Sequence, residues 1–537
     1  MQQGKFKKNL SLLDLTFLGV GSIIGSGWLF ASMTGASFAG GSSWIAWVAG
    51  AVAVLLIGIV YAELSAAIPR AGGFVRYPEY SHGSLVGYLI GFSSLLAYSS
   101  VAAIEVEAVR AHATYYLPML SYNNGNPTLL GHTLEILLLV VFFLLNYWSV
   151  NVFGKINTIV TSFKFVVPTI TIIVLFFYFK GGNFSIAGAT PGGAHGIFEA
   201  IAGGGIVFAF LGFRQAVDFG AEAKNPQRDI PRAIFLAIAL GTIVYLLLQV
   251  TFIGGVPTNL IAHSGWGQVA NVLKGSNYPF VALASSLGVT WLATLLLVDA
   301  VISPAGTGNI YLSGTSRVIF AFSRNRYFYS IFAKVSPSTG IPRPAMWFTM
   351  ILAIIWTLPS GLSSWQTLVG SVTSATVMTY MIGPVTMASL RRTMPNLHRP
   401  FRLQWAGVIN PLAFIAATLI IYWSGWTTDL LLIGLTLGSL VLYFAFMDRD
   451  EQSRRNLIDH WKAGAWLVVY YLFILLLTYL GSFGPLANPV IPGPYLDSVV
   501  AAIGGLIFYL WGVGSALPKP SFDTDDESDA ELDLRGV

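Results

Sequence analysis

Apolar segments long enough to cross a bilayer recur along almost the whole of this chain. A transmembrane helix needs about 20 mainly apolar residues, and we identify about fourteen such stretches. Only 10% of the residues are charged, whereas soluble domains contain about 25%. The sequence therefore predicts an all-α polytopic membrane protein. The expected spans are roughly 11–34, 43–68, 84–112, 130–150, 156–179, 197–221, 232–255, 279–312, 344–360, 366–390, 408–425, 428–447, 463–482 and 496–517.

Lysine and arginine residues follow the connections between these spans in a regular way. Of the 29 in the chain, three lie within spans, and Lys180 and Lys274 lie in connections on one side. That leaves 24 for the termini and the connections on the other side. Cytoplasmic loops carry the excess of positive charge. We therefore expect a cell-membrane protein with an even number of spans and both termini cytoplasmic, whose net charge of +5 reflects topology and not nucleic-acid binding.

The first span is interrupted by glycine. Its segment 19–30, GVGSIIGSGWLF, contains four Gly and two Ser, although each Gly inside a helix costs roughly 0.5–1 kcal/mol relative to Ala. Unwound backbone at membrane depth is tolerated where it is buried in protein or lines a cavity. Two hypotheses follow. Small residues here let helices approach closely, or a break between Gly21 and Gly27 exposes N–H and C=O groups that bind a small polar solute.

A second interrupted span lies five spans later. Its segment 203–220, GGGIVFAFLGFRQAVDFG, begins with three consecutive glycines, Gly203–Gly205, and is divided by Gly212. Two broken helices in this relation are typical of transporters built from inverted five-span repeats, with the substrate bound between them. Free N–H groups at the start of a half-helix suit a carboxylate, and free carbonyls at its end suit an ammonium. The pair of breaks therefore predicts a site for a zwitterion.

Several motifs resemble those of the amino acid–polyamine–organocation superfamily of permeases. They are GVGSIIGSGWLF, YAELSAAIPRAGG at 61–73, and FAFLGFRQ followed by EAKNPQRDIPRAI. The section from Asp299, DAVISPAGTGNIYLSGTSRVIFAFSRN, is similar to a subgroup that includes bacterial aspartate–proton symporters. The resemblance covers at least 11–392 and implies amino-acid transport by a five-plus-five inverted-repeat core with broken helices 1 and 6.

The rest of the chain is arranged around this expected core, 11–392. Residues 1–10 form a short basic terminus, 393–517 supply four additional transmembrane helices, and 518–537 form an acidic tail that we expect to be disordered. There is no cysteine, and the seven histidines lack metal-ligand spacing, so we expect no metal or other cofactor. No nucleophile–base pair or phosphate loop indicates an enzyme, and the oligomeric state stays open.

The resemblance implies a substrate site made largely of backbone groups on both broken helices. The substrate carboxylate is expected at the N–H groups of Ser26 and Gly27, and an aromatic gate is expected at Phe208. The substrate ammonium is expected at the carbonyls near Ile23, Phe208, Ala209 and Leu211.

Two ionisable residues are predicted to couple transport to protons. Lys164 follows Lys155 by nine residues, or ~13 Å along a helix, which places it near the bilayer midplane, where a charge is a functional hypothesis by default. It matches the span 5 lysine of proton-coupled relatives, whose ammonium replaces a sodium ion. The alternative is a structural cation on the carbonyls of a broken helix. Asp299, in the middle of span 8, can partner Lys164 or Arg214, or relay protons.

Arg214 departs from the superfamily pattern, because many relatives carry Glu at this place. A guanidinium does not lose its proton in proteins, so Arg214 is not a proton carrier. It can bind a second carboxylate of the substrate, which favours aspartate or glutamate. Alternatively, it pairs internally with Asp218 or Asp299, and the sequence leaves both hypotheses open.

Four ionisable residues gather toward the outer end of span 3. They are Glu105, Glu107, Arg110 and His112. We expect them to be wetted by the external mouth of the protein and not to take part in function.

Together these features predict secondary active transport. The leading hypothesis is proton-coupled symport of an acidic amino acid, with a small amino acid, protons and the lipid bilayer as the partners. The alternatives are an amino-acid exchanger, a permease for neutral or cationic amino acids, an ion uptake system of the same fold, and a receptor-like sensor.

Overall fold

The computed structural model describes residues 6–147, 150–186, 190–273, 278–358, 365–447 and 457–520. In these ranges the regular structure is helical, and β-type pairing is limited to isolated bridges. Among the described residues, eleven helices or continuous helix groups are long and apolar enough to cross a membrane. The predicted class, an all-α polytopic membrane protein, is therefore confirmed, whereas the count of fourteen spans stays a prediction.

The first half of the core begins with a broken span. The first helix ends at Ile23 and the second begins at Ser26, with Gly25 between them in a non-helical conformation (φ −126°, ψ −141°). The predicted break in span 1 is thus present. The helices of this half are α1 (Leu12–Ile23), α2 (Ser26–Ala39), α3 (Ser43–Ala67), α4 (Gly73–His82), α5 (Ser84–Ala113), α6 (Leu129–Tyr147) and α7 (Val150–Phe177).

The second half begins with a second broken span. Gly205 has a left-handed conformation (φ +85°) at the start of the short α9, and a 3-10 turn over Leu211–Arg214 separates α9 from α10. As in the first half, short helices follow the second span. The helices are α8 (Gly193–Ala202), α9 (Ile206–Phe210), α10 (Gln215–Asp218), α11 (Pro226–Gly255), α12 (Thr258–Ser264), α13 (Val269–Val272), α14 (Pro279–Ser286), α15 (Thr290–Arg324), α16 (Arg343–Thr357), α17 (Trp365–Tyr380) and α18 (Ile382–Thr393).

Further helices follow the expected core, 11–392, and pack against it. The expected span 428–447 is divided into two helices at Ser439. Residues 521–537, most of the expected acidic tail, lie outside the described ranges. The helices are α19 (Ala406–Trp423), α20 (Trp426–Gly438), α21 (Leu440–Met447), α23 (Leu457–Leu480) and α24 (Tyr495–Ser515).

Connections predicted to share one side of the membrane lie together. Leu10 pairs with Ala223, and Arg317 forms an ion pair with Glu222 (2.9 Å). Among the connections expected on the opposite side, the Asn183 side chain donates to carbonyls at the end of α11. These contacts agree with the grouping of connections that the distribution of basic residues predicts. Which face is cytoplasmic stays a prediction.

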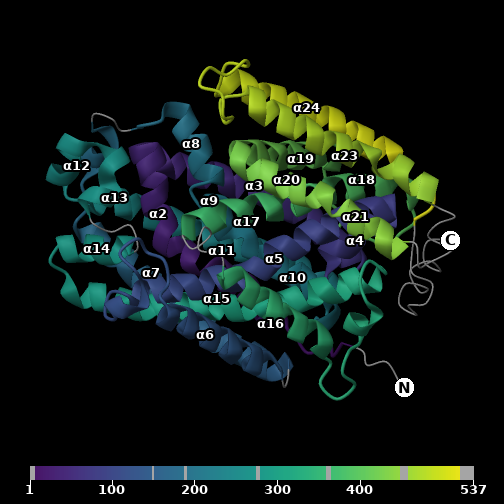
Figure 1. Cartoon of the computed structure of the whole chain (residues 1–537), viewed down its shortest axis with the longest axis horizontal. Helices are drawn as coiled ribbons and strands as arrows, with labels where there is room; N and C mark the ends of the chain where they lie inside the picture. The colour runs from purple at the N-terminus through teal and green to yellow at the C-terminus, as the bar shows by residue number, and fades with distance from the viewer. Residues whose placement is uncertain are drawn as a thin grey trace.

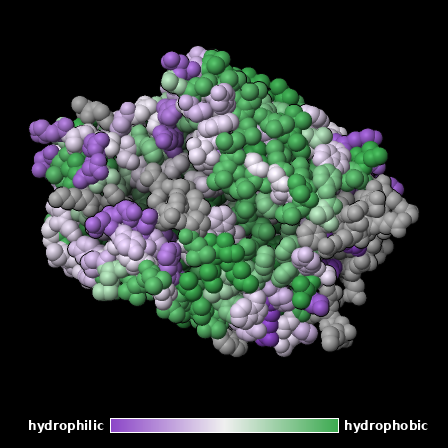
Figure 2. All heavy atoms as spheres, in the orientation of Figure 1, coloured by the Kyte–Doolittle hydropathy of each residue, from purple (hydrophilic) through white to green (hydrophobic). Residues whose placement is uncertain are grey.

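Hydrophobic side chains cover the middle of the molecule. In Figure 1 the short helices α12 and α13 lie at one end of the long axis, and the long helices run between the two ends. Figure 2 shows hydrophobic residues across the centre of this face and hydrophilic ones gathered toward the ends. Such a band is what a bilayer requires of a polytopic protein.

Candidate functional site

The two breaks lie against each other inside the protein. A Cβ atom added to Gly27 would lie 3.1 Å from the Cβ atom of Ala209 and 3.6 Å from Cδ1 of Phe208. A Cβ atom added to Gly212 would lie 2.5 Å from the backbone nitrogen of Ile23. Glycine permits this approach because it has no side chain. The two segments that carry the predicted substrate site therefore adjoin. Close packing and a break are both present at span 1, and binding of a solute there stays a prediction.

Replacing Gly212 with alanine is expected to disrupt this junction. The new methyl group would meet backbone atoms of Ser22 and Ile23, which cannot rotate away, and overpacking of this kind costs about 1–3 kcal/mol. The thermal unfolding midpoint and transport should both fall. Gly434→Ala in α20 is the matched control, because a Cβ atom there meets nothing within 4 Å and alanine is the better helix former. An unchanged midpoint in the Gly212 variant would contradict the close contact.

Tyrosine hydroxyls hold two of the predicted carbonyls. Tyr245 of α11 donates to the Ile23 carbonyl (2.5 Å), and Tyr380 of α17 donates to the Leu211 carbonyl (2.7 Å). Both tyrosines are fully buried. The Ile23 carbonyl also accepts a hydrogen bond from the Gly25 amide (3.0 Å), so both of its lone pairs are used in this structure. The structure thus places Ile23 and Leu211 at the breaks, and their contact with a substrate stays a prediction.

Lys164 of α7 lies at the carboxyl end of α1. Its side chain is 0% exposed, and Nζ donates to the Gly21 carbonyl (2.6 Å) and to Oγ1 of Thr307 in α15 (2.8 Å). The Thr307 hydroxyl is in turn within 2.7 Å of the Gly21 carbonyl and 3.2 Å of the Ile24 carbonyl. A cation at the free carbonyls of a helix C-terminus is favourable. The geometry is compatible with the structural role and with the proton-coupling role. Thr307 itself carried no signal in the sequence.

Asp299 lies near Lys164 without touching it. The carboxylate is 0% exposed and accepts a hydrogen bond from Ser303 Oγ (3.0 Å), and the two charged groups interact electrostatically. No ion pair joins them in the part of the chain that the structure describes. The proton-coupling role of Asp299 therefore stays a prediction, with its proximity to Lys164 in its favour.

Glu105 of α5 reaches the start of α2. Its Oε2 accepts a hydrogen bond from the Ser26 amide (2.9 Å), and its Oε1 accepts one from the Ser26 hydroxyl (3.1 Å). Like Asp299, it interacts electrostatically with Lys164. Sequence reasoning missed this residue, although a carboxylate within an apolar span is a signal of function. The sequence pattern had grouped Glu105 with charged neighbours near the external end.

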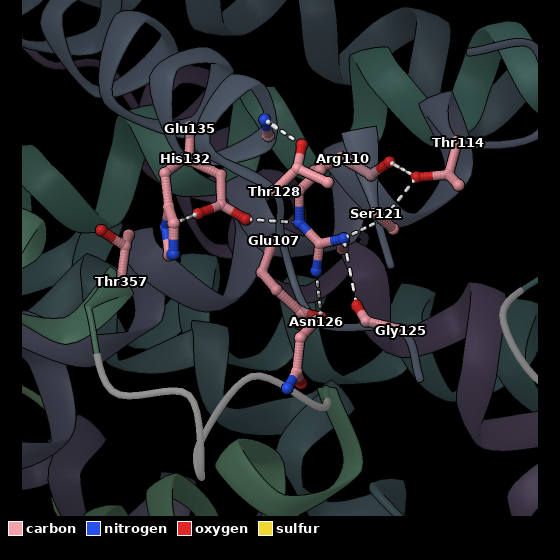
Figure 3. Close-up of polar contacts among 12 residues, drawn as sticks. Glu107, Arg110, Thr114, Ser121, Gly125, Asn126, Thr128, His132, Glu135 and Thr357 are labelled. Carbon is pink, nitrogen blue, oxygen red and sulfur yellow. Dashed lines mark hydrogen bonds and ion pairs between the residues drawn. The ribbon is translucent and has the colours of Figure 1, made fainter. Parts of the chain in front are cut away.

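The other charged residues of α5 form a separate cluster. Arg110 forms ion pairs with Glu135 of α6 (2.6 Å) and with Glu107 (3.3 Å), and it donates to Ser121 in the connecting loop. His132 lies 3.3 Å from Glu135. Figure 3 shows Glu135, Glu107 and Ser121 around the Arg110 guanidinium, with His132 beside Glu135. The cluster ties the loop between α5 and α6 to both helices.

The expectation that the span 3 cluster is wetted is wrong. Each of its four ionisable residues is buried. They are Glu105, Glu107, Arg110 and His112. Arg110 is held by α6 and the connecting loop, whereas Glu105 lies against Ser26 of α2.

Arg214 is enclosed by protein groups. It is 0% exposed, and its Nε donates to Asp218 (2.8 Å). The remaining donors reach Thr379 (2.9 Å) and Ser94 (3.0 Å), and the guanidinium lies 4.0 Å from the centre of the Tyr98 ring. The internal ion pair, one of the two sequence hypotheses, is present with Asp218 as the partner. Binding of a second substrate carboxylate by Arg214 stays a prediction.

The absence of a metal stays an expectation. No group of three or more His, Cys, Asp or Glu side chains is arranged there to hold an ion. The buried ammonium of Lys164 and the buried carboxylate of Glu105 contact the break in span 1, and the buried carboxylate of Asp299 interacts electrostatically with Lys164.

Comparison with known proteins extends over most of the chain. The family model of amino acid permeases matches residues 10–447. An aspartate-proton symporter of Bacillus subtilis (strain 168) is 44% identical over 529 residues, which cover 98% of this chain and 99% of that protein. A glutamate/serine transporter of the same organism is 38% identical over 537 residues, with 98% and 96% covered. A branched-chain amino acid permease is 28% identical over 458 residues, with 83% and 94% covered.

Proposed function

The chain belongs to the amino acid permease family, and from this premise we propose that it moves acidic amino acids across the cell membrane in symport with protons. It is a transporter and not an enzyme. Two of its relatives, an aspartate-proton symporter and a glutamate/serine transporter, align with it along almost their whole length. Their substrates support an acidic amino acid for this chain.

The observation that carries the proposal is the charge triad at the break of span 1. The Lys164 ammonium donates a hydrogen bond to the Gly21 carbonyl, and it interacts electrostatically with the buried carboxylates of Glu105 and Asp299. When all three are ionised, the triad has a net charge of −1, which is unfavourable inside a membrane. One added proton neutralises it. Proton uptake is thereby tied to the backbone segment on which the substrate site is proposed.

The substrate site in this proposal is the junction of the two breaks. The amides at the start of α2, at Ser26 and Gly27, receive the α-carboxylate because they lie at a helix N-terminus. Phe208, which is 8% exposed, covers the site as an aromatic gate. The carbonyls near Ile23, Ala209 and Leu211, with that of Phe208, receive the ammonium.

Alternating access follows from the same geometry. The breaks join half-helices whose relative tilt can change while the site between them persists. With the basic connections on the inner side, both termini are cytoplasmic. Aspartate and protons then enter from the outer face, which carries α12 and α13, and leave on the inner face.

Uptake by purified protein in liposomes tests the proposed function. We expect labelled aspartate to accumulate against its gradient when the outside is more acidic than the inside, and to stop accumulating when the gradient is collapsed by a proton ionophore. Competition by all common amino acids then ranks the substrates. Transport that requires internal amino acid but ignores the proton gradient would identify an exchanger. Absence of uptake for every amino acid would contradict transport of this class.

A further inference from the structure

The Glu105 carboxylate occupies the position in which a substrate carboxylate is expected. Both of its oxygens are hydrogen-bonded to Ser26, the first residue of α2, at 2.9 and 3.1 Å. The residue is 1% exposed, and a Cβ atom added to Gly25 would lie only 2.9 Å from its Oε1. One amide hydrogen can serve one carboxylate oxygen at full strength. Glu105 and an amino-acid substrate therefore compete for the same donor.

We propose that Glu105 is an internal stand-in for the substrate carboxylate, and that it releases Ser26 only when it takes up the proton that is transported. The proposal rests on the proposed symport function and names the group that makes proton and amino acid bind together. The proton arrives from the outer aqueous phase and forms an O–H bond on the carboxylate. It leaves that oxygen on the inner side after the substrate has gone.

The surroundings of Glu105 explain why the exchange must be coupled. The groups that interact with it electrostatically are the ammonium of Lys164 on α7 and the phenols of Tyr245 on α11 and Tyr311 on α15. Only Lys164 among them is cationic, and it is also shared with Asp299. A second carboxylate brought to Ser26 beside an ionised Glu105 would meet strong repulsion in a low-dielectric interior. A protonated Glu105 is neutral, so its hydrogen bond to the Ser26 amide is weaker, and the substrate carboxylate can replace it.

The experiment compares aspartate affinity of the purified wild-type protein and the Glu105→Gln variant from about pH 5 to pH 8. The charge of aspartate is constant in this range, so any pH dependence belongs to the protein. Glutamine preserves the shape and an acceptor oxygen but cannot titrate. For the wild type, aspartate binding requires the uptake of one proton, so the apparent affinity should weaken by up to about tenfold for each unit by which the pH rises. For the variant we expect no such slope and about tenfold tighter binding at the alkaline end.

Glu107→Gln is the matched control, since it removes a buried carboxylate two residues away on the same helix that pairs with Arg110 instead. It should keep the wild-type slope. Glu105→Asp retains an acid whose side chain is one methylene shorter, so it should keep the slope with tighter binding at the alkaline end. This variant decides the matter if Glu105→Gln does not fold.

Three results would overturn the inference. A wild-type slope in Glu105→Gln would place the coupled proton elsewhere. Loss of aspartate binding at every pH in folded Glu105→Gln would make Glu105 a structural cap of α2. Wild-type affinity throughout in Glu105→Asp would show no competition. A wild-type protein that binds no aspartate contradicts the proposed function instead, so the two failures are distinguishable.

Discussion

Accumulation of aspartate is expected to disappear when Lys164 is replaced with alanine. A one-proton symporter driven by a gradient of two pH units can accumulate its substrate up to ~100-fold, because each pH unit is worth 1.36 kcal/mol. The variant should reach a ratio of about 1. Loss of the ammonium leaves the Gly21 carbonyl without its 2.6 Å donor and removes the cation between two buried carboxylates. The measurement is the final internal-to-external ratio of labelled aspartate in liposomes.

Two further variants separate coupling from folding. Lys164→Gln retains an N–H donor for the Gly21 carbonyl but carries no titratable group, so it should fold better than the alanine variant and be equally uncoupled. Lys180→Ala removes an exposed lysine beyond the end of α7 and should accumulate aspartate like the wild type. If the Lys164 variants accumulated aspartate in response to a pH gradient as the wild type does, Lys164 would have a structural role and no part in proton coupling.

Arg214→Ala is expected to cause the largest loss of stability. The change leaves Asp218 0% exposed and without its 2.8 Å partner, and breaking a buried ion pair in this way costs about 3–5 kcal/mol. The thermal unfolding midpoint and the yield of folded protein should fall sharply. Arg228→Ala, which removes an exposed arginine in the first turn of α11, is the control and should unfold like the wild type.

The double variant Arg214→Met with Asp218→Leu tests what else Arg214 does. It replaces both charges with apolar side chains, so stability should largely return, because buried ion pairs are often matched by well-packed hydrophobic residues. We expect its uptake of aspartate and of alanine to change to the same degree, since the guanidinium donates to three protein side chains. A selective loss of aspartate uptake would instead support the binding of a second carboxylate.

The positions of the helices were predictable because hydrophobic length is a local property of sequence. The expected span 84–112 corresponds to α5, Ser84–Ala113, and the expected span 408–425 corresponds to α19, Ala406–Trp423. The breaks were predictable for a similar reason. Glycine weakens a helix wherever it lies, and the runs around Gly25 and Gly205 interrupt spans 1 and 6 as expected.

The roles of the two carboxylates on α5 were not predictable in the same way. Glu105 and Glu107 are two residues apart, and residues of an α-helix are separated by about 100° each, so their side chains point in nearly opposite directions. One meets Ser26 on α2, and the other meets Arg110 in the outer cluster. Their local sequence is nearly the same, and only the neighbours of each face distinguish them.

Apolar length, charge distribution and glycine content act within one segment. The membrane class, the family resemblance, the order of the spans and the location of the two breaks were therefore predictable from the sequence alone. It also singled out Lys164, since a charge at mid-membrane needs a reason wherever its partner lies. The tertiary structure decided which partners meet. It placed Lys164 on the Gly21 carbonyl, paired Arg214 with Asp218, and brought Glu105 to Ser26. Two of these contacts join residues from different helices, and for Arg214 the sequence offered more than one partner. The energies of all three contacts depend on burial, which exists only in the packed bundle.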